Sequence, residues 1–193
     1  MAQGPTTEFA AQIGERIRRL RRERSVSLSS LARDAGVGKA TLSGIEDGSR
    51  GNPTVETLYA IAGRLGVPLA ALLPEPGHGA EDAPLQAIHG TAVSAVLLET
   101  FADEGTVTEL HRLHIRPGYE QHSPAHPPGT VEFLTVFTGT ARVGPSGATV
   151  VVPPGGHVSW TSDTPHVYAT ASDDDVFASL LIRTPRLPAT PTG

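Results

Sequence analysis

The sequence predicts a protein of two domains, an all-α domain of five helices followed by an all-β barrel domain. Its 193 residues suit one or two domains. Residues 1–73 carry 10 basic and 7 acidic side chains, a net charge of +3, whereas residues 74–193 carry 5 and 13, a net charge of −8. All eight histidines lie in the second part. A basic part joined to an acidic part indicates that only one domain meets nucleic acid.

The first helix is predicted over residues 8–24. Phe9, Ile13, Ile17 and Leu20 recur at the spacing of one helix face. The rest of the helix is crowded with Arg16, Arg18, Arg19, Arg21, Arg22 and Arg24. The simplest interpretation is a solvated face. In a DNA-binding domain, some of these arginines would instead contact phosphate, which adds affinity without reading sequence.

Two short helices with a tight turn are predicted between Ser27 and Ser49. Ser27 is a suitable N-cap, and Gly36 stands where the first helix needs a left-handed residue at its end. The second helix, residues 38–48, turns Leu42 and Ile45 inward. Such a pair forms a helix-turn-helix, although ordinary bundles contain similar pairs. The residues near the exposed start of the second helix, from which a base edge could be read, are Lys39, Ala40, Thr41 and Ser43.

The remaining helices of this domain are predicted at 54–66 and 68–73. Thr54 caps the first of them, and Gly66 ends it. The helical domain therefore spans residues 8–73. Residues 74–83, PEPGHGAEDA, are rich in proline, glycine and acidic residues and are predicted to be a linker.

From residue 84 to 185 the pattern predicts an all-β domain. Short runs rich in β-forming residues alternate with glycine and proline turns, which indicates a sandwich or barrel. The predicted strands are 93–101, 107–115, 131–137, 140–143, 148–152, 157–160, 166–170 and 176–183. Residues 186–193 are predicted to be a disordered tail.

One acidic residue, Glu132, stands inside the predicted strand 131–137. Strand alternation puts it on one face with Leu134 and Val136, opposite Phe133. Both faces are otherwise apolar, so we expect the strand to be buried on both sides. A buried charge without a partner is costly, and Glu132 therefore needs a cation, a proton or a hydrogen-bonding ligand.

Residues 13–73 resemble the XRE, or lambda-repressor-like, family of DNA-binding domains. The most diagnostic stretches are LARDAGVGKATLSGIEDG and NPTVETLYAIAGRLGV. The resemblance implies that Arg50 and Asn52 grip phosphate behind the recognition helix. Leu28 and Ser29 occupy the place where many members carry a glutamine that binds phosphate, and Ser29 is the candidate phosphate contact there. The matching glutamate in this family, here Glu46, holds the scaffold together.

The second domain resembles the cupin superfamily, a small jelly-roll barrel. Its motifs read G-x5-H-x-H-x3-4-E-x6-G and G-x5-P-x-G-x2-H-x3-N. Glu132 and Gly139 fit the end of the first motif, and Gly155 and His166 fit the second. The paired histidines are spread out, as His122 and His126. Further departures are the residues that replace proline, glycine and asparagine in the second motif: Thr161, Asp163 and Thr170.

The resemblance implies a site whose chemistry the sequence leaves open. His126, Glu132 and His166 could hold a divalent metal, Fe, Zn, Ni or Mn, because two histidines and a carboxylate suit such ions. The same groups could instead exchange hydrogen bonds with an organic ligand, and the irregular spacing favours this metal-free pocket. His122 and Trp160 are the further candidate ligand-binding residues. The histidines expected on strand faces instead are His111, His114 and His157.

The combined pattern predicts a transcriptional regulator that binds operator DNA as a homodimer and senses a small-molecule effector. The alternative is an enzyme, a metal-dependent cupin oxygenase or epoxidase with a helical domain. A third interpretation gives the cupin domain only a role in dimerisation. The chain has no cysteine, no apolar run of membrane-spanning length and no signal peptide, so we expect a cytoplasmic protein without a membrane partner.

Overall fold

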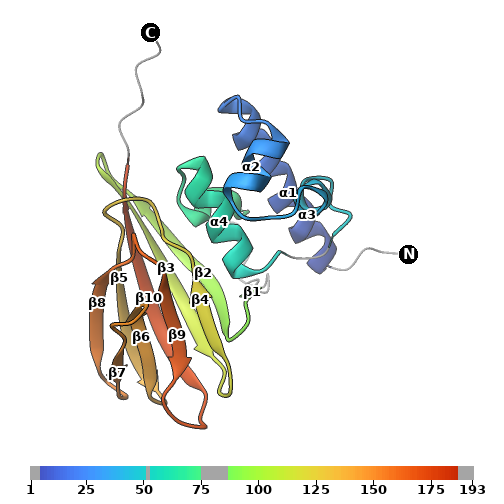
Figure 1. Ribbon diagram of the computed structural model, residues 1–193. Helices are drawn as coiled ribbons and strands as arrows, with labels where there is room; N and C mark the ends of the chain where they lie inside the picture. The colour runs from blue at the N-terminus through green and yellow to red at the C-terminus, as the bar shows by residue number, and fades with distance from the viewer. Residues whose placement is uncertain (1–4, 51–52, 75–86, 187–193) are drawn as a thin grey trace.

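The computed structural model describes residues 5–50, 53–74 and 87–186, which form a helical domain and a β domain in contact with each other (Figure 1). The predicted linker lies outside the described residues except for Pro74, and so does the predicted tail from residue 187. Among the helices described, none is long and apolar enough to cross a membrane. The helices are α1 (Pro5–Glu23), α2 (Leu28–Asp34), α3 (Lys39–Glu46), α4 (Val55–Leu65) and the 3-10 helix η1 (Leu69–Leu72). The predicted fifth helix is thus a single 3-10 turn.

Local signals begin and end α2 and α4 at the predicted residues. The Ser27 side chain accepts a hydrogen bond from the backbone N–H of Ser30 at 3.0 Å. Thr54 caps α4 in the same way. Gly36 and Gly66 follow α2 and α4 with φ of 67° and 66°, a left-handed conformation that glycine adopts without steric penalty. Helices α2 and α3, joined through Gly36, form the predicted helix-turn-helix.

Helix α3 is locked onto α1 by a buried ion pair and by close backbone packing. Arg21 donates two hydrogen bonds of 2.7 Å to the Glu46 carboxylate, and Arg18 donates to the backbone carbonyl of Glu46. A Cβ atom at Gly14 would lie 2.0 Å from the carbonyl oxygen of Ile45, so the two helices can approach only because residue 14 is glycine. Glu46 is therefore a scaffold residue, as the resemblance implied. Arg18 and Arg21 serve the same scaffold.

The described part of the β domain consists of two antiparallel sheets, with strand orders β1-β2-β3-β10-β5-β8 and β4-β9-β6-β7. All eight predicted strands occur. Strands β1 and β4 were not predicted, because β1 has three residues and β4 is mostly polar. The bounds are β1 (Ala87–His89), β2 (Val93–Ala102), β3 (Thr106–Ile115), β4 (Glu120–Ser123), β5 (Val131–Thr138), β6 (Ala141–Pro145), β7 (Val150–Val152), β8 (His157–Thr161), β9 (His166–Thr170) and β10 (Val176–Pro185).

Strand β5 is buried on one face only, and the prediction of burial on both faces was wrong. Glu132, Leu134 and Val136 have no exposed surface and point into the core between the sheets. On the other face, Phe133 is half-buried and Phe137 is 58% exposed. Aromatic residues on the solvent-facing side of a strand give the same apolar pattern as a strand buried on both faces. The alternation pattern alone therefore gave the wrong prediction for β5.

The two domains meet along helix α4 and η1. Glu56 of α4 accepts hydrogen bonds from the backbone N–H and the hydroxyl of Thr91, at 3.0 and 3.1 Å. Glu109 of β3 accepts a hydrogen bond from the backbone N–H of Ala70 in η1. Buried apolar residues of both domains form one continuous cluster. The helical domain is therefore packed onto the β domain (Figure 1).

Candidate functional site

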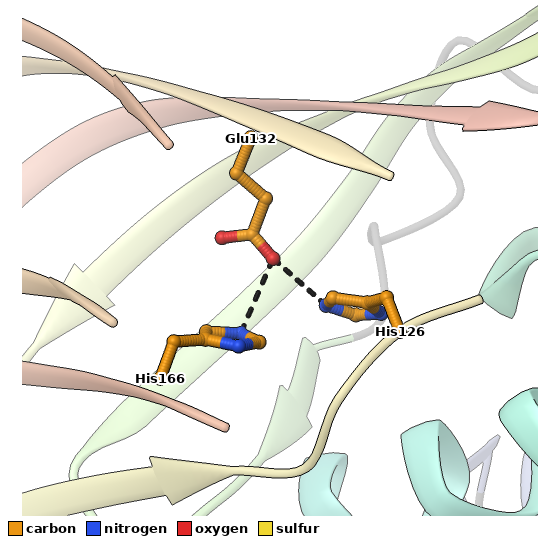
Figure 2. Close-up of side chains that lie close together, drawn as sticks. All are labelled: His126, Glu132 and His166. Carbon is orange, nitrogen blue, oxygen red and sulfur yellow. Dashed lines mark ion pairs between the residues drawn. The ribbon is translucent and has the colours of Figure 1, made fainter. Parts of the chain in front are cut away.

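Three side chains from separate segments converge in the core of the β domain (Figure 2). Glu132 points inward from β5, in one sheet, and His166 is the first residue of β9, in the other. His126 comes from the loop between β4 and β5, where its backbone N–H donates a hydrogen bond to the carbonyl of Ser162 at 2.9 Å. The site therefore joins both sheets and the loop that faces the helical domain.

One carboxylate oxygen is the centre of this site. Oε1 of Glu132 lies 2.7 Å from Nε2 of His126 and 3.2 Å from Nε2 of His166. The ligand atoms of the three residues all lie within 4.8 Å of one another. Among the described residues, these three atoms have no hydrogen bond of good geometry. The other carboxylate oxygen, Oε2, accepts a hydrogen bond from the hydroxyl of Tyr168, which orients the carboxylate.

The charges of the site favour a cation between the carboxylate and the imidazoles. Burial raises the pKa of Glu132, but the facing His126 and His166 outweigh it and hold that pKa well below its usual range. Burial lowers the pKa of His166, and Glu132 more than reverses this, so the pKa is raised. His166 also places Nδ1 3.0 Å from the carbonyl of Thr164. If Nδ1 carries the proton, it donates a hydrogen bond to that carbonyl. The unprotonated Nε2 can then coordinate a metal ion, an arrangement common in metal sites.

The donor set therefore fits a divalent metal, although a bound proton or a polar ligand would use the same groups. Two histidines and one carboxylate are the donors that divalent iron and related ions accept with positions left open. The site has a second layer of orienting groups in Tyr168 and the Thr164 carbonyl, as such sites require.

Aromatic and polar residues that the sequence did not assign to the site surround it. Tyr168 was missed, although it lies two residues after His166 and strand alternation places both on one face. His111 was expected on a strand face. It is fully buried, and within the described residues both of its ring nitrogens lack partners. Burial lowers the pKa of His111 to about 4, against the charge of Glu132, and this favours a neutral ring at neutral pH.

Two further aromatic residues complete the walls. Trp160, a candidate ligand-binding residue, is buried, and its ring centroid lies 6.4 Å from that of His166. Tyr59 reaches the site from helix α4 and meets the His126 ring edge-on, with centroids 4.4 Å apart. Burial raises the pKa of Tyr59 well above its usual value, and the charges of Glu109 and Glu132 raise it further. No sequence signal linked Tyr59 to this site, because it belongs to the other domain.

His122 does not join the site, which corrects its prediction as a ligand-binding residue. Its side chain is 70% exposed, and Nε2 lies 2.9 Å from Glu120 on the surface. Period-two alternation along β4 turns His122 outward, whereas His126 reaches the core from the irregular loop that follows. His114 and His157 lie on the outer face of the first sheet, near Asp175 and Thr135 respectively.

The candidate DNA-contacting residues lie on the outer surface of the helical domain. Lys39 and Ala40 are exposed at the start of α3, and Thr41 and Ser43 are half-buried. Ser29 and Arg50 are also exposed, and the backbone N–H of Arg50 donates to the carbonyl of Gly44 at 2.9 Å. Asn52 lies outside the described residues. These candidate residues are thus at least partly accessible to solvent.

Comparison with known proteins identifies the helical domain. Residues 17–72 match the helix-turn-helix family HTH_3. The chain is 29% identical over 171 residues to the HTH-type transcriptional regulator SutR of Escherichia coli (strain K12), covering 88% of this chain and 93% of SutR.

Two crystal structures are also similar. An HTH_3 family transcriptional regulator from Vibrio cholerae aligns with a TM-score of 0.75 and 26% identity, over 94% of this chain and 99% of that one. The cupin_2 domain of an XRE family transcriptional regulator from Enterobacter cloacae aligns over 49% of this chain, with 24% identity and a TM-score of 0.45. Residues 17–72 thus match the HTH_3 helix-turn-helix family, and the two proteins that the chain resembles along most of its length are described as transcriptional regulators.

Proposed function

We propose that this transcriptional regulator binds operator DNA through α3 and controls that binding through a ligand held by His126, Glu132 and His166. The β domain acts as a cupin-type sensor, and the ligand is a divalent metal, Fe, Zn, Ni or Mn, or a small molecule bound at the same groups. One observation carries the proposal: a buried carboxylate oxygen faces two imidazole nitrogens in the core of a regulator's second domain. A regulator needs no such site unless something binds there.

When bound, a divalent ion would supply a positive charge and open coordination positions for a small molecule. His126, Glu132 and His166 would hold it. Tyr168 fixes the carboxylate, and Trp160 and His111 enclose the site. The buried position excludes bulk water, which strengthens the electrostatic attraction between the carboxylate and a cation.

The test combines DNA binding with metal analysis. Purified protein, stripped with a chelator or loaded separately with each of the four ions, is titrated onto DNA from the promoter region of its own gene. We expect at least one ion to bind in a 1:1 ratio and to change DNA affinity by about 5–150-fold, the usual range of coupling between two sites. Stoichiometric binding of an ion without any change in DNA affinity would contradict the proposal, as would the absence of binding by metals and small organic acids alike.

On the DNA side, we propose that Lys39, Ala40, Thr41 and Ser43 read base edges, while Ser29, Arg50 and Asn52 hold phosphates. Lys39→Ala is expected to weaken specific binding by about 1–3 kcal/mol if Lys39 contacts a base. The measurement is fluorescence anisotropy on promoter DNA and on a scrambled sequence. Arg142→Ala is the matched control, because it removes one positive charge from the β domain. Unchanged affinity when Lys39, Thr41 and Ser43 are all replaced would refute the assignment.

The orienting role of Tyr168 gives a second expected result. Tyr168→Phe leaves Oε2 of Glu132 without its hydroxyl donor, so we expect metal affinity to fall by about 10–100-fold, as for other losses of outer-shell partners. Competition against a chelating indicator measures it. Tyr119→Phe is the control, because Tyr119 is 61% exposed. Equal affinities of the two variants would show that Tyr168 does not orient the carboxylate.

We also propose a homodimer that binds a palindromic site, because helix-turn-helix proteins double their base contacts by two-fold symmetry. The outer face of the first sheet is the surface we assign to the second copy. Leu181 of β10 pairs in register with both Leu110 and Phe133, and these three line a hollow of about 370 Å³. Phe137 and Phe177 are exposed beside it, at 58% and 45%.

Light scattering tests this surface. The wild type is expected at twice the mass of one chain, and Phe133→Glu is expected to yield monomers because it places charge in the hollow. Val151→Glu, at a 59% exposed position on β7 in the other sheet, is the control. A wild type that is monomeric with and without DNA would rule out the dimer.

An oxygenase remains the second candidate function, favoured by one observation. Two histidines and a carboxylate are the donor set of non-haem Fe(II) oxygenases. Consumption of O2 by the Fe(II)-loaded protein that depends on an added organic acid would support it. The regulatory function of the homologues favours the sensor.

A further inference from the structure

Helix α4 turns one face toward the β domain. Glu56, Tyr59 and Gly63 follow one another at intervals of three and four residues, which places them on one side of the helix. Glu56 binds Thr91, and Tyr59 contacts His126. A Cβ atom at Gly63 would lie 3.6 Å from the carbonyl oxygen of Ala125. The helix is thus in contact with the loop that carries His126.

That loop is stiff, but its contact with α4 leaves space. Pro124, Pro127 and Pro128 flank His126, and proline fixes the backbone angle φ. Between the loop and α4 lies a groove of about 300 Å³, with Ala60, Gly63 and Arg64 on the helical side and residues 124–128 on the other. A displaced His126 can therefore move relative to α4 without unfolding either segment.

We infer that Tyr59 reports the occupancy of the metal site to the DNA-binding domain, because its ring packs directly on His126. The inference rests on the proposed function and names the route by which sensing reaches DNA. In this structure, Nε2 of His126 lies 2.7 Å from Oε1 of Glu132. Two ligand atoms of one divalent ion stand about 3 Å apart or more, because each bond measures about 2.1 Å. Uptake of an ion between them thus separates His126 from Glu132, and the ring edge of Tyr59 must follow or lose its contact.

The movement has a direct route to the recognition helix. Helix α4 contacts α2, and α2 contacts α3, within the apolar core of the helical domain. Small shifts at packed interfaces are transmitted because such interfaces have few alternative arrangements. Linkage also requires that DNA binding change the metal affinity by the same factor as metal changes DNA affinity.

Zn²⁺ is the probe for the test, and two substitutions of Tyr59 are compared. Tyr59→Phe keeps the ring contact, and Tyr59→Leu removes it while leaving the position apolar. Zn²⁺ affinity is measured with and without promoter DNA, and DNA affinity with and without Zn²⁺. We expect the wild type and Tyr59→Phe to show the same coupling factor, about 5–150-fold, and Tyr59→Leu to show about twofold or less. In the absence of Zn²⁺, all three should bind promoter DNA with similar affinity, a result that a general loss of structure would not produce.

A cross-link provides an independent test, because the chain has no cysteine of its own. Gly63→Cys combined with Ala125→Cys places two thiols across the contact between α4 and the loop. The oxidised protein is expected to lose coupling between Zn²⁺ and DNA, and the reduced protein and the single variants are expected to keep it. If Tyr59→Leu and the oxidised protein both keep the wild-type factor, the inference is wrong while the sensor function stands. If the wild type itself shows no coupling, both are wrong.

Discussion

Glu132→Gln is expected to abolish the stabilisation of this protein by divalent metal. A ligand that binds only the folded state at a hundredfold excess over its dissociation constant raises the free energy of unfolding by about 2.7 kcal/mol. The substitution removes the charge from the central oxygen of the site, between His126 and His166. Loss of an outer-shell partner lowers metal affinity by about 10–100-fold, and loss of the charged ligand should do more. At the same metal concentration, stabilisation then falls to about 0.4 kcal/mol or less.

Urea unfolding with and without each metal measures this effect. The matched control is Glu120→Gln, the same chemical change at a carboxylate that pairs with Arg142 and His122 outside the core. The control should keep the full metal effect. If Glu132→Gln, His126→Ala and His166→Ala were all stabilised as much as the wild type, the ligand would have to bind elsewhere.

The second large effect concerns pH and two buried residues on the inner face of β3. Glu109 is 1% exposed, and burial, opposed by the backbone N–H groups of η1, raises its pKa to about 7. Burial lowers the pKa of His111 to about 4. In mildly acidic solution the folded protein therefore binds more protons at Glu109 than the unfolded chain does. At His111 it binds fewer.

Glu109 stabilises the protein at low pH. Between about pH 4.5 and 7 the folded protein keeps the Glu109 proton that the unfolded chain has released, so this contribution is complete below pH 4.5 and is lost as pH rises through 7. His111 acts oppositely. Its ring stays neutral in the folded protein while the unfolded chain gains a proton below about pH 6.5, so its contribution is complete above that pH and is lost toward pH 4. Each amounts to about 3 kcal/mol, and they largely cancel between pH 4.5 and 6.5.

Single substitutions should separate the pH dependence that Glu109 gives to the free energy of unfolding from the opposite dependence that His111 gives. From pH 4.5 to 7.5, the stability of Glu109→Gln relative to wild type is expected to rise by about 3 kcal/mol. The relative stability of His111→Leu should instead rise as pH falls from 6.5 to 4. Urea titrations of metal-free protein at each pH measure both, with the exposed Glu99→Gln as the baseline. Parallel pH profiles for wild type and both variants would show that neither group titrates differently on folding.

The sequence by itself determined the helical domain, because its signals are local. Ser27 and Thr54 cap helices, and Gly36 and Gly66 end them, through contacts only two to four residues long. Alternation likewise placed Glu132 on one strand face with Leu134 and Val136, and eight of the ten described strands were predicted. The tight packing at Gly14 has no such local signal, because the atom it avoids belongs to Ile45.

Only the tertiary structure decided that His122 stays outside the site and which residues surround its three central members. Alternation states which face a strand residue occupies, but it cannot say how far a loop residue reaches, so His122 and His126 looked alike in sequence. The structure turns the first outward and brings the second to 2.7 Å from Glu132. Tyr168, His111 and Tyr59 join through pairing between distant strands and through contact between domains. Such contacts depend on the summed packing of the whole chain, so the sequence named the three central residues while the fold alone determined what surrounds them.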